Sequence, residues 1–215
     1  MSDQGYRARC ALLPDAGYDF GLVTLQYGII RLHVRRRGKA AHSSRPEEGD
    51  NAIESFQRTF IEFKKRIAKI PETVSSLAII SGGIALNVVP DLCDAKIDIR
   101  TARSGEVLAL IAEMFEADEY DIMTNEPSLR IDPKHPFIRL YKKVAEEKLK
   151  RPVKPVELRG ATDARYLSPF KVPVIISSPK GAGHHEDSEW VDLKSLELCE
   201  DIAVKFLSEF GKLTK

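Results

Sequence analysis

Residues 28–36 read "GIIRLHVRR", and apolar side chains alternate in them with charged or polar ones. In an extended chain Ile30, Leu32 and Val34 point to one side, and the arginines and the histidine between them point to the other. This period of two predicts a β-strand with one face in a core and one face in water.

An amphipathic helix is expected directly after this strand. Residues 50–70 read "DNAIESFQRTFIEFKKRIAKI", and their bulky apolar residues recur at intervals of three and four. That spacing places them on one side of a helix. Asp50 is the expected N-cap of the helix, and Pro71 is expected to stop it.

The next segments continue the alternation of strands and helices. Strands are predicted at 75–80, 93–100 and 119–124, and a second helix at 105–115. The resulting order, strand-helix-strand-strand-helix-strand, predicts a two-layer α+β module of the ferredoxin-like kind over residues 28–126.

The segments on either side of this module have a different character. Residues 1–27 contain turns and short strands, whereas residues 127–215 contain helices at 137–149 and 193–210 around a continuous apolar strand at 172–179. Such a strand is typical of a sheet that is covered on both faces. We therefore expect residues 1–27 and 127–215 to form part of one α/β domain, into which the module 28–126 is inserted.

Composition excludes several classes of protein. The net charge of +1 gives no general attraction to nucleic acid or to anionic membranes, and there is no apolar run of about 18 residues that would cross a bilayer. The first residues lack the apolar segment of a secretory signal, so a cytoplasmic location is expected. An RNA-binding role is disfavoured, because the strands 28–36 and 93–100 carry no aromatic side chains for stacking on bases.

Three polar residues of the inserted module are candidates for function. His42 lies in a turn between a strand and a helix, where a histidine is either solvated or catalytic. Asn87 lies between two turn signals, where it is a candidate for a local backbone cap. Arg100 ends the polar face of a strand, where it is either solvated or the anchor of a carboxylate.

Two further stretches lie near the C-terminus. Residues 158–167 read "LRGATDARYL", which is either a helix start capped by Thr162 or Asp163, or a loop whose N–H groups and arginine receive an anion. Residues 181–190 read "GAGHHEDSEW", where two adjacent histidines are either part of a solvated turn or include a metal ligand.

Taken in order, these four stretches resemble the co-catalytic zinc amidohydrolases. That family includes succinyl-diaminopimelate desuccinylase, acetylornithine deacetylase, aminoacylase, carboxypeptidase G and related dipeptidases. The resemblance extends from about residue 10 to the C-terminus. It implies a zinc-binding α/β catalytic domain, present here in part, with an inserted ferredoxin-like lid that dimerises.

The resemblance also implies roles for individual residues. In the family, the last metal ligand is a histidine four residues before a glutamate. Glu189 matches that glutamate, so His185 rather than His184 is the expected ligand. Asp15 matches an earlier acidic ligand, and His42 matches a lid histidine that reaches the partner subunit's active site and polarises the scissile carbonyl. The residues expected to hold the substrate and its carboxylate are Asn87, Arg100, Gly160, Thr162 and Arg165.

The chemistry implied is hydrolysis of an amide or peptide bond with two zinc ions. The ions share and activate a water molecule, a glutamate moves its proton, and the lid histidine stabilises the developing oxyanion. The implied substrate is a small N-acyl amino acid or peptide with a free carboxylate, and the implied partner is a second copy of the chain.

The sequence departs from the family pattern in its metal ligands. It has no H-x-D segment before residue 27, and its Glu-Glu pairs, at 47–48 and 146–147, lie in other contexts. Because a useful zinc site needs three or four protein ligands, we expect the chain alone to bind zinc weakly or not at all and to be inactive. Truncation, excision from a full enzyme or a split enzyme completed by another polypeptide would each explain this, and a non-catalytic module that dimerises and binds carboxylates is the alternative.

Overall fold

The chain divides into two compact units in a computed structural model, which describes residues 8–16, 18–184 and 186–213. One unit comprises Met1–Gln26 and Leu129–Lys215, and the other comprises Tyr27–Ser128. The unit with both chain ends is thus built from two segments that the other unit separates.

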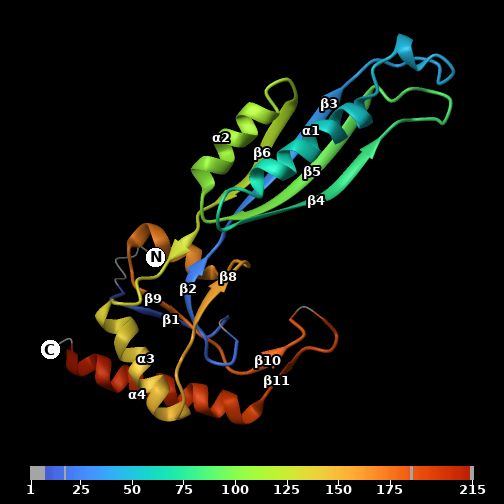
Figure 1. The fold of residues 1–215 in the computed structure, drawn as a ribbon. Coiled ribbons are helices and arrows are strands. Elements are labelled where there is room, and N and C mark those ends of the chain that lie inside the picture. The colour runs from blue at the N-terminus through green and yellow to red at the C-terminus, as the bar shows by residue number, and fades with distance from the viewer. Residues whose placement is uncertain (1–7, 17, 185, 214–215) are drawn as a thin grey trace. The chain divides into compact units, whose positions relative to one another are not determined.

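Unit 27–128 is a four-stranded antiparallel sheet with two helices on one face (Figure 1). The strand order is β4-β5-β3-β6, which leaves β4 and β6 at the edges. Its elements are β3 (Gly28–Arg37), α1 (Ala52–Ile67), β4 (Thr73–Gly82), β5 (Leu92–Thr101), α2 (Ser104–Met114) and β6 (Glu119–Glu126). This order confirms the predicted ferredoxin-like module.

The core of this unit follows from the alternation along β3. Ile30, Leu32 and Val34 are fully buried and belong to one apolar cluster with Phe56 and Phe63 of α1. The intervening polar residues of β3 lie on the opposite face, as the period of two predicts.

The start of α1 differs from the prediction by one residue. Asn51, not Asp50, is the N-cap, and its side chain accepts hydrogen bonds from the backbone N–H groups of Ile53 and Glu54. Asp50 instead pairs with Lys39 through two backbone hydrogen bonds of 2.9 Å. That backbone pairing takes Asp50 out of the capping position, because the helix begins only after the chain has left this bridge.

One arginine of β3 points into the helical layer. Arg36 forms a two-pronged ion pair with Asp118, whose side chain is completely buried, with Nη2 2.7 Å from Oδ2. The same guanidinium donates to Ser55 Oγ at 2.9 Å and to Thr59 Oγ1 at 3.1 Å, both on α1. Arg36 therefore ties β3 to α1 and to the turn that precedes β6.

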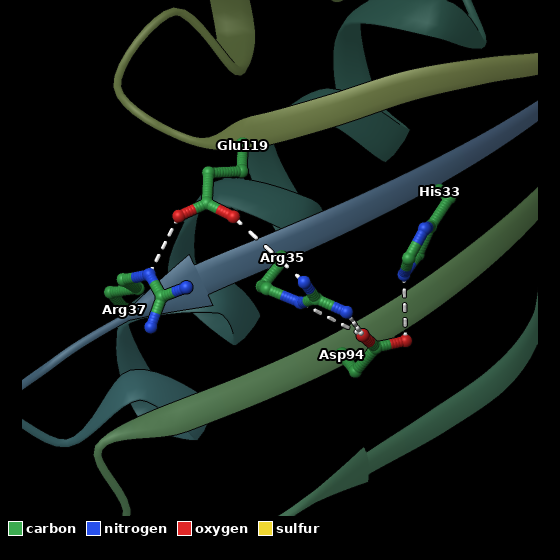
Figure 2. A network of polar contacts seen from close by, with 5 residues as sticks. All are labelled: His33, Arg35, Arg37, Asp94 and Glu119. Carbon is green, nitrogen blue, oxygen red and sulfur yellow. Dashed lines mark hydrogen bonds and ion pairs between the residues drawn. The ribbon is translucent and has the colours of Figure 1, made fainter.

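The open face of the sheet carries a polar network that crosses three strands (Figure 2). Asp94 of β5 accepts from His33 Nε2 at 2.8 Å and from Arg35 at 3.3 Å, both on β3. Glu119 of β6 accepts from Arg37 Nε at 2.6 Å. The hydrogen bond from His33 is the main cause that lowers the pKa of Asp94. Opposite charges thus face each other across the strands, which supports their register.

The unit with both chain ends combines N-terminal and C-terminal strands. β1 (Ala11–Leu13) runs parallel to β9 (Val174–Ile176), and β2 (Leu22–Gln26) lies between β7 (Leu129–Arg130) and β8 (Pro155–Leu158). A short hairpin pairs β10 (Gly181–Ala182) with β11 (Trp190–Val191). The fully buried β9 agrees with the predicted strand that is covered on both faces.

Two helices pack together in this unit. α3 (Pro136–Leu149) contacts α4 (Leu193–Leu213) through aromatic pairs, among them Tyr141 with Phe206 at 5.7 Å between ring centroids. Short 3₁₀ helices are η2 (Pro46–Glu48) and η3 (Asp163–Phe170). Within the described part of the chain, no helix is long and apolar enough to cross a membrane.

We expect Asp118→Ala to lower the free energy of unfolding of unit 27–128 by about 3–5 kcal/mol, because it leaves the charge of Arg36 half-buried without its partner. The matched control is Glu119→Ala. The adjacent Glu119 is more than half exposed, so its ion pair with Arg37 contributes only about 0–1 kcal/mol. Denaturant unfolding of both variants measures the difference, and equal losses of stability would contradict the prediction.

Candidate active site

The structure brings His42 and Asn87 together at one end of the four-stranded sheet. The loop after β3 and the loop before β5 are joined by an antiparallel bridge between His42 and Val88. Ser43 N donates to the carbonyl of Asn87 at 3.0 Å, and Val89 N donates to that of Ala41 at 2.9 Å. Two candidates from separate stretches of sequence thus share one tip, and both side chains are exposed.

The ring of His42 is oriented by its neighbour Ser44. The backbone N–H of Ser44 donates to Nδ1 at 3.2 Å, and Ser44 Oγ lies 2.8 Å from the same atom. Since an N–H group can only donate, Nδ1 is the acceptor and the neutral ring carries its proton on Nε2. His42 consequently presents an N–H donor at the exposed tip.

Arg100 lies at the opposite end of the same sheet. It is eight residues from Leu92, the tip end of β5, which corresponds to about 27 Å along a strand. Its guanidinium forms a forked pair with Asp98 of the same strand face, with Nε–Oδ1 and Nη2–Oδ2 distances of 2.9 Å. A substrate carboxylate at Arg100 therefore competes with a carboxylate of the protein itself.

The loop 160–165 is a capped helix start in the other unit. Thr162 Oγ1 accepts from Ala164 N at 3.2 Å, so Thr162, rather than Asp163, caps η3. Arg165 is half-buried; its Nη1 donates to the Thr162 carbonyl at 3.1 Å and its Nη2 to Tyr166 Oη at 2.8 Å. Gly160 is exposed at the start of this loop. The loop thus has an ordered cap and an arginine held beside it.

Sequence reasoning did not identify the residue that contacts this loop most extensively. Gln26, the last residue of β2, is fully buried and hydrogen-bonds to Thr162. A polar residue at the end of the apolar stretch "LVTLQ" was the only available signal, and such a residue is equally typical of a strand end.

The predicted metal ligands are only partly described. Asp15 is exposed in the turn after β1, whereas His185 lies outside the described residues. Its neighbour His184 places Nδ1 3.3 Å from Glu189 Oε1, and its ring contacts the tilted ring of Tyr18 at 4.9 Å between centroids. In the described structure, Glu189 therefore interacts with His184.

The described donor atoms do not make a complete zinc centre. Among residues 8–16, 18–184 and 186–213, no group of three or more histidine, cysteine or acidic side chains is arranged to hold a metal ion. Because a stable zinc site takes three or four such ligands, the residues described do not fit a self-sufficient zinc site.

A small pocket in the same unit contains a tyrosine and a cysteine. Its volume is about 310 Å³, and Tyr141, Ser177 and Cys199 line it. Burial raises the pKa of Tyr141 to about 12 and also raises that of Cys199. Both groups are protonated near pH 7, so neither is a ready base or nucleophile.

Comparisons with known proteins agree with this architecture. Residues 24–119 match the family of peptidase dimerisation domains of the M20 type. A peptidase M20 domain-containing protein of Schizosaccharomyces pombe is 28% identical over 178 residues, which cover 79% of this chain and 40% of that protein. A probable carboxypeptidase of Aspergillus clavatus is 33% identical over 94 residues, 38% of this chain and 22% of that protein.

A solved structure shows the same fold over nearly the whole chain. A tripeptidase of Staphylococcus aureus superposes with a TM-score of 0.84 at 18% identity, over 96% of this chain and 58% of that one. These matches show that the chain is similar to M20 peptidases, in agreement with the resemblance seen in the sequence. The matched region spans 40%, 22% and 58% of these three proteins, less than two thirds of each.

We expect neutral His42 to carry its proton on Nε2, because Ser44 N–H occupies Nδ1. Nitrogen-15 NMR of the histidine side chains distinguishes the two tautomers. The Ser44→Ala variant keeps the backbone donor and should keep the same tautomer. A protonated Nδ1 in the neutral ring of either protein would contradict this prediction.

Proposed function

We propose that the chain provides the lid and part of the catalytic domain of a zinc-dependent hydrolase of amide or peptide bonds. The substrate class proposed is a small N-acyl amino acid or peptide with a free carboxylate. Similarity to M20 peptidases supports the reaction class, and the observation that carries the assignment is the tip where His42 and Asn87 meet.

The role proposed for the tip is stabilisation of an oxyanion. With Nδ1 held by Ser44, His42 directs its proton from Nε2 outward, so it can donate to the carbonyl oxygen as negative charge develops there. Asn87, on the adjoining loop, supplies a neutral amide for orienting the substrate. Neither role requires a change in protonation state.

Arginine forks are proposed to bind the substrate carboxylate. Arg165 lies at the capped start of η3, where the positive end of the helix dipole favours an anion. Arg100 is the second proposed anchor. Because it is already paired with Asp98, a substrate carboxylate must displace the Asp98 carboxylate in order to bind it. Such anchors favour substrates that end in a free carboxylate.

The metal site proposed for this chain is incomplete. Asp15 and His185 are the proposed ligands, and in the family pattern they serve different ions. When bound, zinc supplies an activated water molecule and polarises the carbonyl. Since the described donors do not form a three-ligand group, we propose that the chain alone binds zinc weakly.

Self-association through unit 27–128 is the proposed quaternary arrangement. The tip residues and Arg100 lie at opposite ends of one sheet, so a second copy is needed for a tip to approach a site that uses Arg100. The edge strand β4 exposes Ile79 and Ile80, which are 55% and 49% accessible. An exposed apolar edge strand pairs readily with another strand.

We expect Ile80→Lys to weaken self-association about tenfold or more, because a charge on the edge strand opposes strand pairing. The matched control is Leu207→Lys, the same kind of change at an exposed position of α4 in the other unit. Sedimentation velocity over a range of concentrations gives the dimer constants. An unaltered constant for Ile80→Lys, or a monomeric unsubstituted chain, would overturn the proposed arrangement.

Metal content and turnover test the proposed incomplete site. After equilibration with zinc and gel filtration, the purified chain should retain far fewer than two zinc ions and should not release amino acids from N-acetyl amino acids. Elemental analysis and an amine-detection assay give both values. Two retained zinc ions or sustained turnover would show a complete site. If the dimer binds carboxylates but hydrolyses nothing at any zinc concentration, the alternative of a non-catalytic module is favoured.

A further inference from the structure

Gln26 is a buried polar side chain that the roles above do not use. Its exposed fraction is 0%, and it ends β2, the central strand of the β7-β2-β8 sheet. Burying an amide is unfavourable unless its donor and acceptor atoms are hydrogen-bonded. The partners of this amide therefore indicate what the residue does.

Both polar atoms of the Gln26 amide contact a single residue. Oε1 accepts from Thr162 N at 3.1 Å and from Thr162 Oγ1 at 2.6 Å, and Nε2 donates to the Thr162 carbonyl at 3.4 Å. The side chain thus pairs with the N–H and C=O of one backbone position, in the way that a neighbouring strand does. Gln26 extends the sheet by one pairing, from β2 to the loop after β8.

Thr162 passes this constraint on to Arg165. The carbonyl that accepts from Gln26 also accepts from Arg165 N at 3.3 Å and from Arg165 Nη1 at 3.1 Å. The hydroxyl that donates to Gln26 also accepts from Ala164 N at 3.2 Å. The buried amide of Gln26 therefore supports both the cap of η3 and, through Thr162, the position of the Arg165 guanidinium.

We infer that Gln26 is the positioning residue that holds the loop 160–165, and with it Arg165, in the conformation that receives a substrate carboxylate. This inference rests on the proposed function for the identity of the ligand, but not for the coupling between Gln26 and the loop. The role needs an acceptor and a donor in one neutral side chain, which only glutamine or a protonated glutamate supplies at this length.

The first test replaces the amide with an apolar chain of similar length. In Gln26→Met, hydrogen-exchange protection of the Thr162 and Ala164 amides should fall about tenfold or more, because the buried loop groups lose their partners. Protection of the β2–β8 amides, such as that of Leu25, should persist. The matched control is Gln57→Met, the same change at an exposed position of α1, which should alter none of them.

A second variant keeps the test decisive if Gln26→Met does not fold. Burial raises the pKa of a carboxyl group, so in Gln26→Glu the side chain is neutral at mildly acid pH and offers the O–H donor and the acceptor that the amide offered. Loop protection factors in this variant should approach those of the unsubstituted chain at pH 5.5 and fall at pH 8. A role in general packing alone does not predict recovery with protonation.

Ligand binding then tests separately whether the loop that Gln26 holds binds a carboxylate through Arg165. N-acetyl-L-alanine is the probe, and uncharged N-acetyl-L-alaninamide is its comparison. NMR titration should show about tenfold weaker binding of the acid to Gln26→Met and to Arg165→Leu, and little change for Arg151→Leu, an arginine of the same unit that pairs with Asp19.

Unchanged loop protection in Gln26→Met, or no pH dependence in Gln26→Glu, would overturn the positioning role. A loosened loop in a chain that binds the acid no better than the amide would leave Gln26 as the positioning residue of the loop. That result would count instead against the proposed carboxylate site.

Discussion

The parallel pairing of β2 with β8 is the constraint on which the unit with both chain ends depends. Leu22–Gln26 aligns with Pro155–Leu158, so two segments more than 100 residues apart form one sheet. On its other side β2 pairs with β7, where Gln26 lies opposite Leu129, so residues 27–128 leave and return at neighbouring points and form a separate compact unit. The same pairing places the end of β2 beneath the loop that follows β8, where Gln26 meets Thr162.

In unit 27–128, antiparallel register decides which candidates are neighbours. The loop after β3 and the loop before β5 meet at one end of the sheet. His42 and Asn87 therefore share a tip, although they are 45 residues apart in sequence. Arg100 pairs with Ile29 at the other end. One sheet thus carries candidate residues at both ends, and this separation is the physical basis for proposing a role for a second copy of the chain.

Some local details depend on competition between neighbouring groups. Asp50 and Asn51 are both good capping residues, but Asp50 is drawn into a backbone bridge with Lys39, which leaves the cap to Asn51. Thr162 and Asp163 were equally plausible caps of η3; Thr162 takes the role because its hydroxyl also reaches Gln26. In both cases a contact with a residue outside the helix selects between adjacent candidates.

The sequence by itself determined the elements of unit 27–128 and the resemblance to M20 peptidases. The alternation in residues 28–36 and the helical spacing after it specify β3 and α1, because side-chain period reflects local backbone geometry. The histidine, arginine and threonine candidates also came from short local patterns. Only the tertiary structure decided that Arg100 is held by Asp98, that Arg36 crosses to a buried Asp118, and that Gln26 supports the loop of Arg165. Except for the Arg100–Asp98 pair, these contacts join residues far apart in the chain, and none leaves a periodic signal, because side-chain partners depend on rotamers and neighbours in space rather than on residue spacing.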